Sequence, residues 1–142
     1  MAINRKNSND NIIDITKFFS RDNEENGKWY QPKVKGKECG IEFKIYGPNS
    51  NAQSVADDKF NKEKEEIDMI EDSVEKEERY KEALAKKLAA YCGDIRGANG
   101  AKLSLGDDKE VTKKDIYDIF VNSPVIALDV MRYAARQENF LD

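Results

Sequence analysis

The segment 39–50 reads CGIEFKIYGPNS and contains the clearest alternation of apolar and polar residues in the chain. Its apolar positions are Cys39, Ile41, Phe43 and Ile45. A period of two residues predicts a β-strand with one buried face and one face in water. Pro48 cannot extend a strand, and Asn49 or Ser50 can cap a helix. We therefore expect the strand to end here and a helix to begin.

A second strand is predicted before this segment, from Trp29 to Val34, with a turn at residues 35–37. Pro32 restricts it to an edge or irregular strand, because proline cannot donate a hydrogen bond to a neighbouring strand. The two strands together form a β-hairpin, and we assign the hairpin region to residues 12–47.

The residues before the hairpin divide into a polar start and a short apolar island. Residues 1–11 are rich in Asn and other polar residues, and we expect a disordered N-terminal tail there. The apolar island contains spacings of three and four residues, which suit one or two helical turns. Its members are Ile12, Ile13, Ile15, Phe18 and Phe19.

Residues 52–91 contain neither glycine nor proline and are rich in Glu, Lys and Ala, which predicts helix. At ~1.5 Å per residue, an unbroken helix of this length would run ~60 Å, which exceeds the diameter of a compact domain of this size. Either the helix projects, or it breaks near Asp72-Ser73 and folds back. We assign residues 50–92 to one long helix or a helix pair, and we favour a projecting or bent helix over the pair.

The C-terminal third contains two further helix starts. Residues 93–110 are rich in Gly and Asp and are expected to form a connection. Thr112 followed by Asp115 resembles a capping box, which predicts a short helix. Ser123 followed by Pro124 starts another helix, because proline is favoured at the first helical position.

The predicted elements add up to one mainly helical α+β domain over residues 12–142. An N-terminal β-hairpin is followed by a long charged helix and by a C-terminal helical subdomain at residues 111–141. A length of 142 residues suits a single hydrophobic core.

The composition excludes several classes of protein. The chain has 24 Lys and Arg against 28 Asp and Glu, a net charge of −4, no His and two Cys. Without His, an imidazole base and a His-ligated zinc site are excluded. The acidic balance argues against binding to nucleic acid or to an anionic membrane surface. No apolar run reaches the ~18 residues of a transmembrane helix, and the start does not resemble a signal peptide, so we expect a cytoplasmic protein.

Three patterns that could indicate chemistry lack the required spacing or partner. Residues 97–104 resemble a phosphate loop, but the glycine and lysine are not contiguous and no strand is expected before them. The acidic pairs at 57–58 and 107–108 lack the alternate carboxylates and central glycine of a calcium loop. Cys39 and Cys92 have no histidine base. We therefore expect no catalytic residue, no metal, no cofactor and no enzymatic activity.

The helix that starts at Pro124 is apolar on more than one side, so it must be buried on more than one side. Either both sides pack within the domain, or one side docks a partner protein or a second copy of the chain. The candidate partner-binding residues are Val125, Ile126, Leu128, Val130, Met131 and Tyr133. The two helices around Ser123 also have helix-turn-helix dimensions, but the start of the second is apolar and then acidic, unlike a DNA-reading helix.

Several motifs follow one another in a characteristic order. The strand ends in GPNS at 47–50, and the charged helix ends in LAAYC at 88–92. A turn segment, GDIRG at 93–97, precedes the capped helices. Over residues 29–141 this pattern resembles the tail assembly chaperone family of long-tailed bacteriophages. The chain departs from the family in its turn, which lacks the family's aromatic-Asp-Gly run.

The resemblance implies a non-enzymatic role in tail assembly. Such a chaperone would bind the tape-measure protein in the host cytoplasm, keep its long apolar helices soluble and help to load tail-tube subunits. It would also be a possible homo-oligomer. The alternatives are a phage structural or connector protein, at the head–tail junction or as a minor tail protein, and, less favoured, a small DNA-binding regulator.

Overall fold

The computed structural model describes residues 11–142, so the predicted tail at residues 1–11 lies outside the described residues except for Asn11. The α-helices are α2 (Arg21–Asn26), α3 (Asn51–Asp68), α4 (Ser73–Ala90), α5 (Ile116–Asn122) and α6 (Pro124–Ala134). The strands are β1 (Lys28–Tyr30), β2 (Lys33–Val34), β3 (Lys37–Glu38), β4 (Ile41–Ile45) and β5 (Cys92–Gly97). Short 3-10 helices cover Ile15–Phe18, Ala98–Gly100, Lys113–Asp115 and Gln137–Phe140. The protein is mainly helical α+β, as the sequence predicts.

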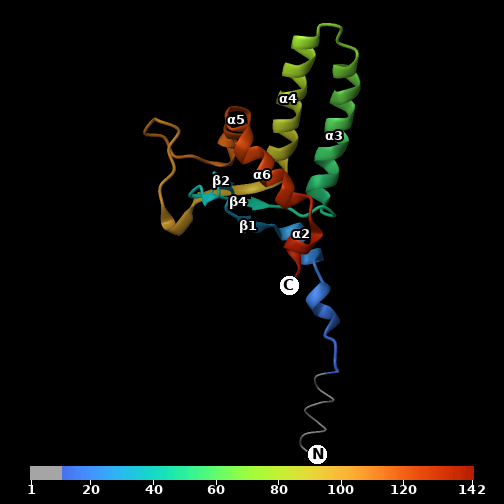
Figure 1. The fold of residues 1–142 in the computed structure, drawn as a ribbon, viewed down its shortest axis with the longest axis vertical. Helices are drawn as coiled ribbons and strands as arrows, with labels where there is room; N and C mark the ends of the chain where they lie inside the picture. Colours follow the sequence, from blue (N-terminus) through green and yellow to red (C-terminus); the bar gives the residue numbers. More distant parts are fainter. Residues whose placement is uncertain (1–10) are drawn as a thin grey trace, which may run out of the picture.

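Three strands form an antiparallel sheet in the order β1-β4-β5, and β2 pairs with β3 in a separate ribbon (Figure 1). β4 is the central strand, with Phe43 opposite Tyr30 on one side and opposite Ile95 on the other. The predicted hairpin is therefore present, but its first strand is split into two parts. Pro32 lies between them, where it cannot donate the hydrogen bond that a continuous strand needs.

Strand β5 lies in the predicted Gly- and Asp-rich connection, so that prediction is wrong for residues 93–97. Cys92, assigned from sequence to the end of the helical region, is the first residue of this strand. Gly and Asp are depleted in strands, which is why the local sequence did not indicate one. Pairing with β4 and burial of Cys92 and Ile95, at 0% and 7% exposed, hold the segment in the sheet. On the other face, the Arg96 side chain pairs with Glu42 of β4 at 2.7 Å.

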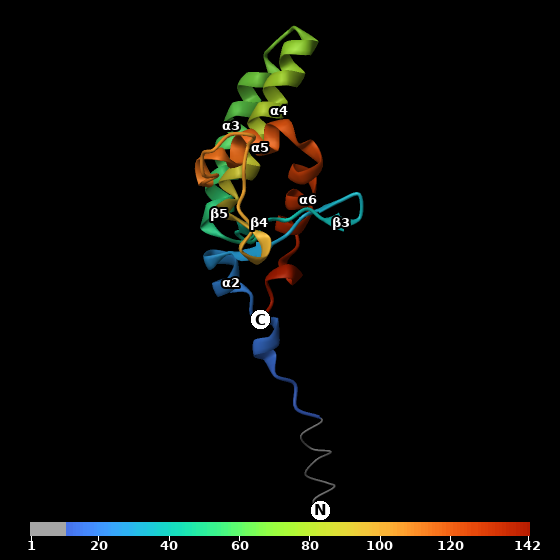
Figure 2. The same cartoon turned by 90° about the vertical axis from the view of Figure 1, so that its left-hand side faces the viewer.

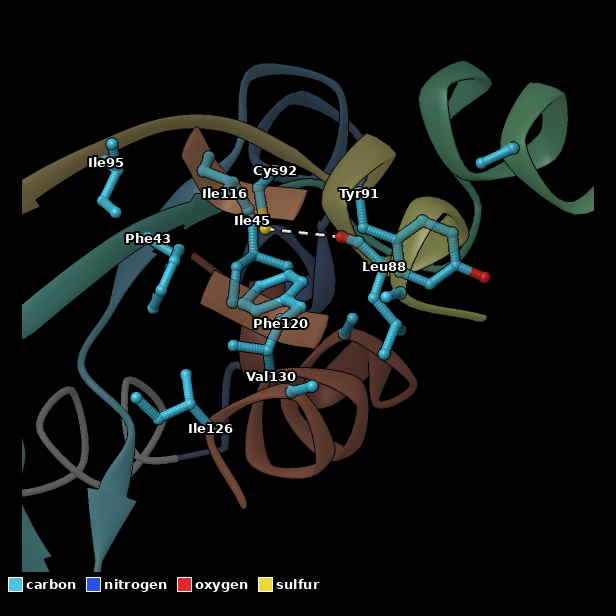
Figure 3. Close-up of a cluster of buried hydrophobic side chains, with 14 of the residues drawn as sticks. Phe43, Ile45, Leu88, Tyr91, Cys92, Ile95, Ile116, Phe120, Ile126 and Val130 are labelled. Carbon is cyan, nitrogen blue, oxygen red and sulfur yellow. Dashed lines mark hydrogen bonds between the residues drawn. The ribbon is translucent and has the colours of Figure 1, made fainter. Parts of the chain in front are cut away.

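The hydrophobic core lies between one face of the sheet and helices α4, α5 and α6 (Figure 3). Phe43 and Ile45 of β4 are fully buried, as the period of two predicts. The rings of Phe43 and Phe120 lie 5.2 Å apart between centroids, which joins the sheet to α5. The buried helical residues opposite the sheet include Leu88, Ile116, Phe120, Ile126 and Val130.

Helices α3 and α4 pack side by side as a hairpin that extends well beyond the sheet (Figures 1 and 2). The helical structure is interrupted at residues 69–72. There the Asp72 carboxylate accepts hydrogen bonds from the N–H groups of Val74 and Glu75 at 2.9 and 3.0 Å. The favoured single projecting or bent helix is therefore wrong, because this cap starts a new helix that folds back. No helix within residues 11–142 is both long enough and apolar enough to cross a membrane.

A small apolar cluster and a few polar contacts hold α3 against α4. The cluster consists of Phe60, Ile67 and Ala83. Lys86 of α4 pairs with Glu63 of α3 at 3.1 Å. At the base of the hairpin, the Tyr91 hydroxyl donates to the Asp57 carboxylate. The hairpin therefore has packing of its own, separate from the main core.

Three predicted helix starts are confirmed. The Ser50 hydroxyl accepts from the N–H of Gln53 at the start of α3. The Asp115 carboxylate accepts from the N–H of Thr112 at 2.8 Å. Pro124 is the first residue of α6. Local capping chemistry, which the sequence contains, therefore fixes where these helices begin.

Helix α2 is fixed to the step between β4 and α3 by the carboxylate of Glu24, which is only 3% exposed. It accepts hydrogen bonds from the Ser20 hydroxyl and from the N–H of Asn49, both at 2.8 Å. Gly47 lies so close to the Glu24 side chain that a Cβ atom there would collide with it. Packing therefore requires the glycine of the GPNS motif.

Replacing Glu24 with Gln should lower the free energy of unfolding by about 1.5–3 kcal/mol, because the amide weakens buried hydrogen bonds to a charged group. Urea denaturation monitored by circular dichroism measures this change. Asp22→Asn, at an exposed position on the same helix, is the matched control and should change stability by less than ~0.5 kcal/mol. Equal effects at the two positions would contradict the role given to Glu24.

Candidate functional site

An apolar groove lies on the surface between α4 and the α5–α6 pair, and we term it the α4–α6 groove. Its apolar lining consists of Leu84, Ala85, Leu88, Val121, Pro124, Ala127 and Leu128. The hollow has a volume of about 250 Å³. This volume is just below the roughly 300–1,000 Å³ of most small-molecule sites. The apolar lining and the open shape also suit side chains inserted from another protein.

The groove follows from the residue sizes on the packed helices. Leu84 and Leu88 lie one turn apart on α4, and Leu128 faces them from α6. Ala85 and Ala127 lie between them and are buried, at 5% and 7% exposed. Their small side chains leave the hollow that larger residues would have filled, while Leu88 belongs to both the groove and the core.

Charged residues of α4 border this apolar lining. Glu78, Lys81 and Glu82 lie at the edge of the groove. Lys81 also pairs with Glu77 at 3.3 Å, and both side chains are well exposed. An apolar floor with a charged border matches a helix that has an apolar stripe flanked by polar residues.

The predicted partner-binding residues of α6 do not share one surface. Ile126 and Val130 are 9% and 0% exposed and lie in the core, so the expectation of a docking surface does not hold for them (Figure 3). Val125 and Leu128 are exposed, at 53% and 42%. Of these two, Leu128 lines the α4–α6 groove. The sequence pattern showed that α6 is buried on several sides, but not which side remains open.

Met131 and Tyr133 are partly buried and pack against the core. The Tyr133 ring stacks on the ring of Tyr30 in β1 with 4.1 Å between centroids. The Tyr30 hydroxyl donates to the carboxylate of Asp129 at 2.7 Å. Burial, and secondly this hydrogen bond, raise the pKa of Tyr30 well above its usual range. Much of the second apolar side of α6 is thus covered by the chain itself.

The buried thiol of Cys92 is a packing group. Its Sγ lies 3.5 Å from the carbonyl oxygen of Leu88, and the side chain is fully buried (Figure 3). Burial raises the pKa of the Cys92 thiol well above its ordinary value, so the reactive thiolate is not populated at neutral pH. Within residues 11–142 there is no group of three or more His, Cys, Asp or Glu arranged to hold a metal ion.

The loop at residues 97–104 does follow a strand, so the expectation that none precedes it is wrong. β5 runs directly into it. After the short turn at Ala98–Gly100, residues 101–112 contain no helix. A phosphate loop binds its ligand with N–H groups at the start of a helix. This loop therefore lacks the backbone arrangement of such a site.

Two exposed apolar surfaces were not singled out as sites by the sequence analysis. One is the N-terminal arm, residues 12–19, whose large side chains are Ile12, Ile13, Ile15, Phe18 and Phe19, at 55–76% exposed. The other is the tip of the α3–α4 hairpin, where Met69 and Val74 are 83% and 75% exposed. The arm was visible as an apolar island, but only the tertiary structure shows that nothing in the described chain covers it.

No protein-family model matches the chain, and neither a curated protein nor a solved structure matches it. The resemblance to phage tail assembly chaperones therefore rests on the sequence pattern described above.

The placement of the α6 residues predicts different costs for two truncations. Val130→Ala should lower the free energy of unfolding by about 2 kcal/mol, because it leaves a cavity in the core. Val125→Ala, the same substitution on the same helix, should change the free energy of unfolding by less than ~0.5 kcal/mol. Thermal or urea unfolding of both variants measures the difference. A large loss at Val125 with none at Val130 would contradict the orientation of α6.

Proposed function

We propose that this protein is a non-enzymatic tail assembly chaperone, which binds apolar helical segments of a phage tape-measure protein in the α4–α6 groove. The observation that carries the proposal is the groove itself: an uncovered apolar hollow between helices, with charges along its edge. The order of sequence motifs over residues 29–141 supports the family assignment.

The groove supports a helix-in-groove mode of binding. A client helix with apolar residues three and four positions apart would insert them over Leu84, Leu88 and Leu128. Each large apolar side chain that becomes buried contributes roughly 1.5–3 kcal/mol before the costs of association. Two or three such side chains give reversible binding, which suits a chaperone that releases its client during assembly.

The α3–α4 hairpin supports a solubilising role. Residues 65–78, at its tip, contain eight Asp and Glu and a single basic residue, Lys76. This concentration of negative charge lies on a hairpin that projects from the body (Figure 1). Repulsion between such charged surfaces opposes aggregation of a chaperone that holds an apolar client.

The proposal extends to partners and location. The tape-measure protein is the expected client in the host cytoplasm, and the chaperone would bring tail-tube subunits to it. These partners come from the resemblance to the chaperone family, and the groove adds the surface on which a helical client would dock.

Co-expression with the tape-measure protein of the same phage tests the proposal. The wild-type protein should raise the soluble yield of the client and co-purify with it. Leu128→Asp should lower co-purification by about tenfold or more, because it places a charge in the groove. Val125→Asp, which exposes a charge on the same helix outside the groove, should behave like wild type.

Two outcomes would contradict the proposal. One is unchanged client solubility with no co-purification. The other is a normal complex with Leu128→Asp, which would show that the groove does not bind the client. Mass spectrometry of purified virions separates the chaperone from a structural or connector protein, because a chaperone is absent from finished particles.

A further inference from the structure

The N-terminal arm, residues 12–19, is an apolar segment with a regular turn in its middle. Ile15–Phe18 forms a 3-10 turn, and the Asp14 carboxylate accepts hydrogen bonds from the N–H and hydroxyl of Thr16 at 3.0 and 2.6 Å. These bonds also hold the pKa of Asp14 below its usual value. The arm therefore presents its apolar side chains from a capped turn.

The base of the arm is tied to the end of the chain. The N–H of Asp142 donates to the carbonyl of Phe19 at 3.1 Å, and the Asn23 amide donates to the carbonyl of Phe140 at 2.9 Å. From this base the arm leaves the body at the end opposite the α3–α4 hairpin, as both views show (Figures 1 and 2). Its apolar side chains thus point into solvent beyond the fold.

We infer that the N-terminal arm of one copy occupies the α4–α6 groove of a second copy, and that two chains exchange arms reciprocally to form a dimer. Each chain supplies an uncovered apolar segment, the arm, and an uncovered apolar groove. Reciprocal exchange covers both on each chain and closes the assembly. The arm and a client helix would compete for the same groove, so a client has to displace the arm, and the inference does not depend on the identity of that client.

The area available agrees with a stable dimer. From their exposed fractions, the five large side chains of the arm offer roughly 500 Å² of apolar surface. The two arms of a reciprocal pair would bury about 1,000 Å² of their own surface, and the two small grooves add roughly 300 Å². Stable protein interfaces bury roughly 1,200–2,000 Å², so two exchanged arms reach the lower end of this range and one arm does not.

The charges of the arm match those at the edge of the groove in one direction. Asp14 and Lys17 are three residues apart on the arm, and Glu78 and Lys81 are three residues apart on α4. An arm antiparallel to α4 places Asp14 near Lys81 and Lys17 near Glu78. A parallel arm would place like charges together. Glu82 lies beside Lys81 at the same edge, so these charges favour the antiparallel direction by only a small amount.

Sedimentation velocity on the full chain tests the exchange. The wild type should sediment with twice the 16.2 kDa monomer mass. Phe18→Asp on the arm and Leu128→Asp in the groove should each raise the dissociation constant about tenfold or more, because each disrupts both contacts. Both positions are exposed, so the variants should fold. Met69→Asp, at the hairpin tip, is the matched control and should remain dimeric.

Mixing the two variants gives the sharpest result. The arm variant retains an intact groove and the groove variant an intact arm, so a heterodimer contains one undisturbed contact. We expect the mixture to associate more strongly than either variant alone. A monomeric wild type, a dimer unaffected by Phe18→Asp, or a mixture no stronger than its components would overturn the inference. If the wild type is monomeric and Phe18→Asp makes the groove more exposed, the arm lies in the groove of its own chain instead.

Discussion

The structure depends on the burial of one face of β4. Phe43 and Ile45 are fully buried, and the strand is paired on both sides, by β1 and β5. Helices α4, α5 and α6 all pack against this face. Without these two side chains the sheet would lose the centre of its apolar face, which the three helices share.

Helix α4 packs against α3 and also against α5 and α6, and this arrangement leaves the groove. The helix contributes Leu88 to the main core, while Ala83 belongs to the separate cluster that packs on α3. Leu84 and Leu128 border an open hollow between α4 and the α5–α6 pair. The site that we propose for a client is thus a consequence of how one helix is shared between two packing units.

The parts of the fold set by local chemistry could be predicted from the sequence, and those set by tertiary contacts could not. The alternation at 41–45 and the cap at Ser50 each depend on neighbouring residues. β5 was missed because its Gly and Asp residues form a strand only through pairing with β4. For the site, α6 was identified as multiply buried, and Leu128 was among its candidates. Leu84 was not, since its role depends on how α4 packs against α6.

Methyl NMR spectra of the labelled protein, recorded with and without an apolar helical segment of the tape-measure protein, test the central claim most directly. The account predicts changes at the methyl groups of Leu84, Leu88 and Leu128, with Val74 at the distant hairpin tip unchanged. Changes centred on the hairpin tip, or none at all, would show that the α4–α6 groove is not the binding surface.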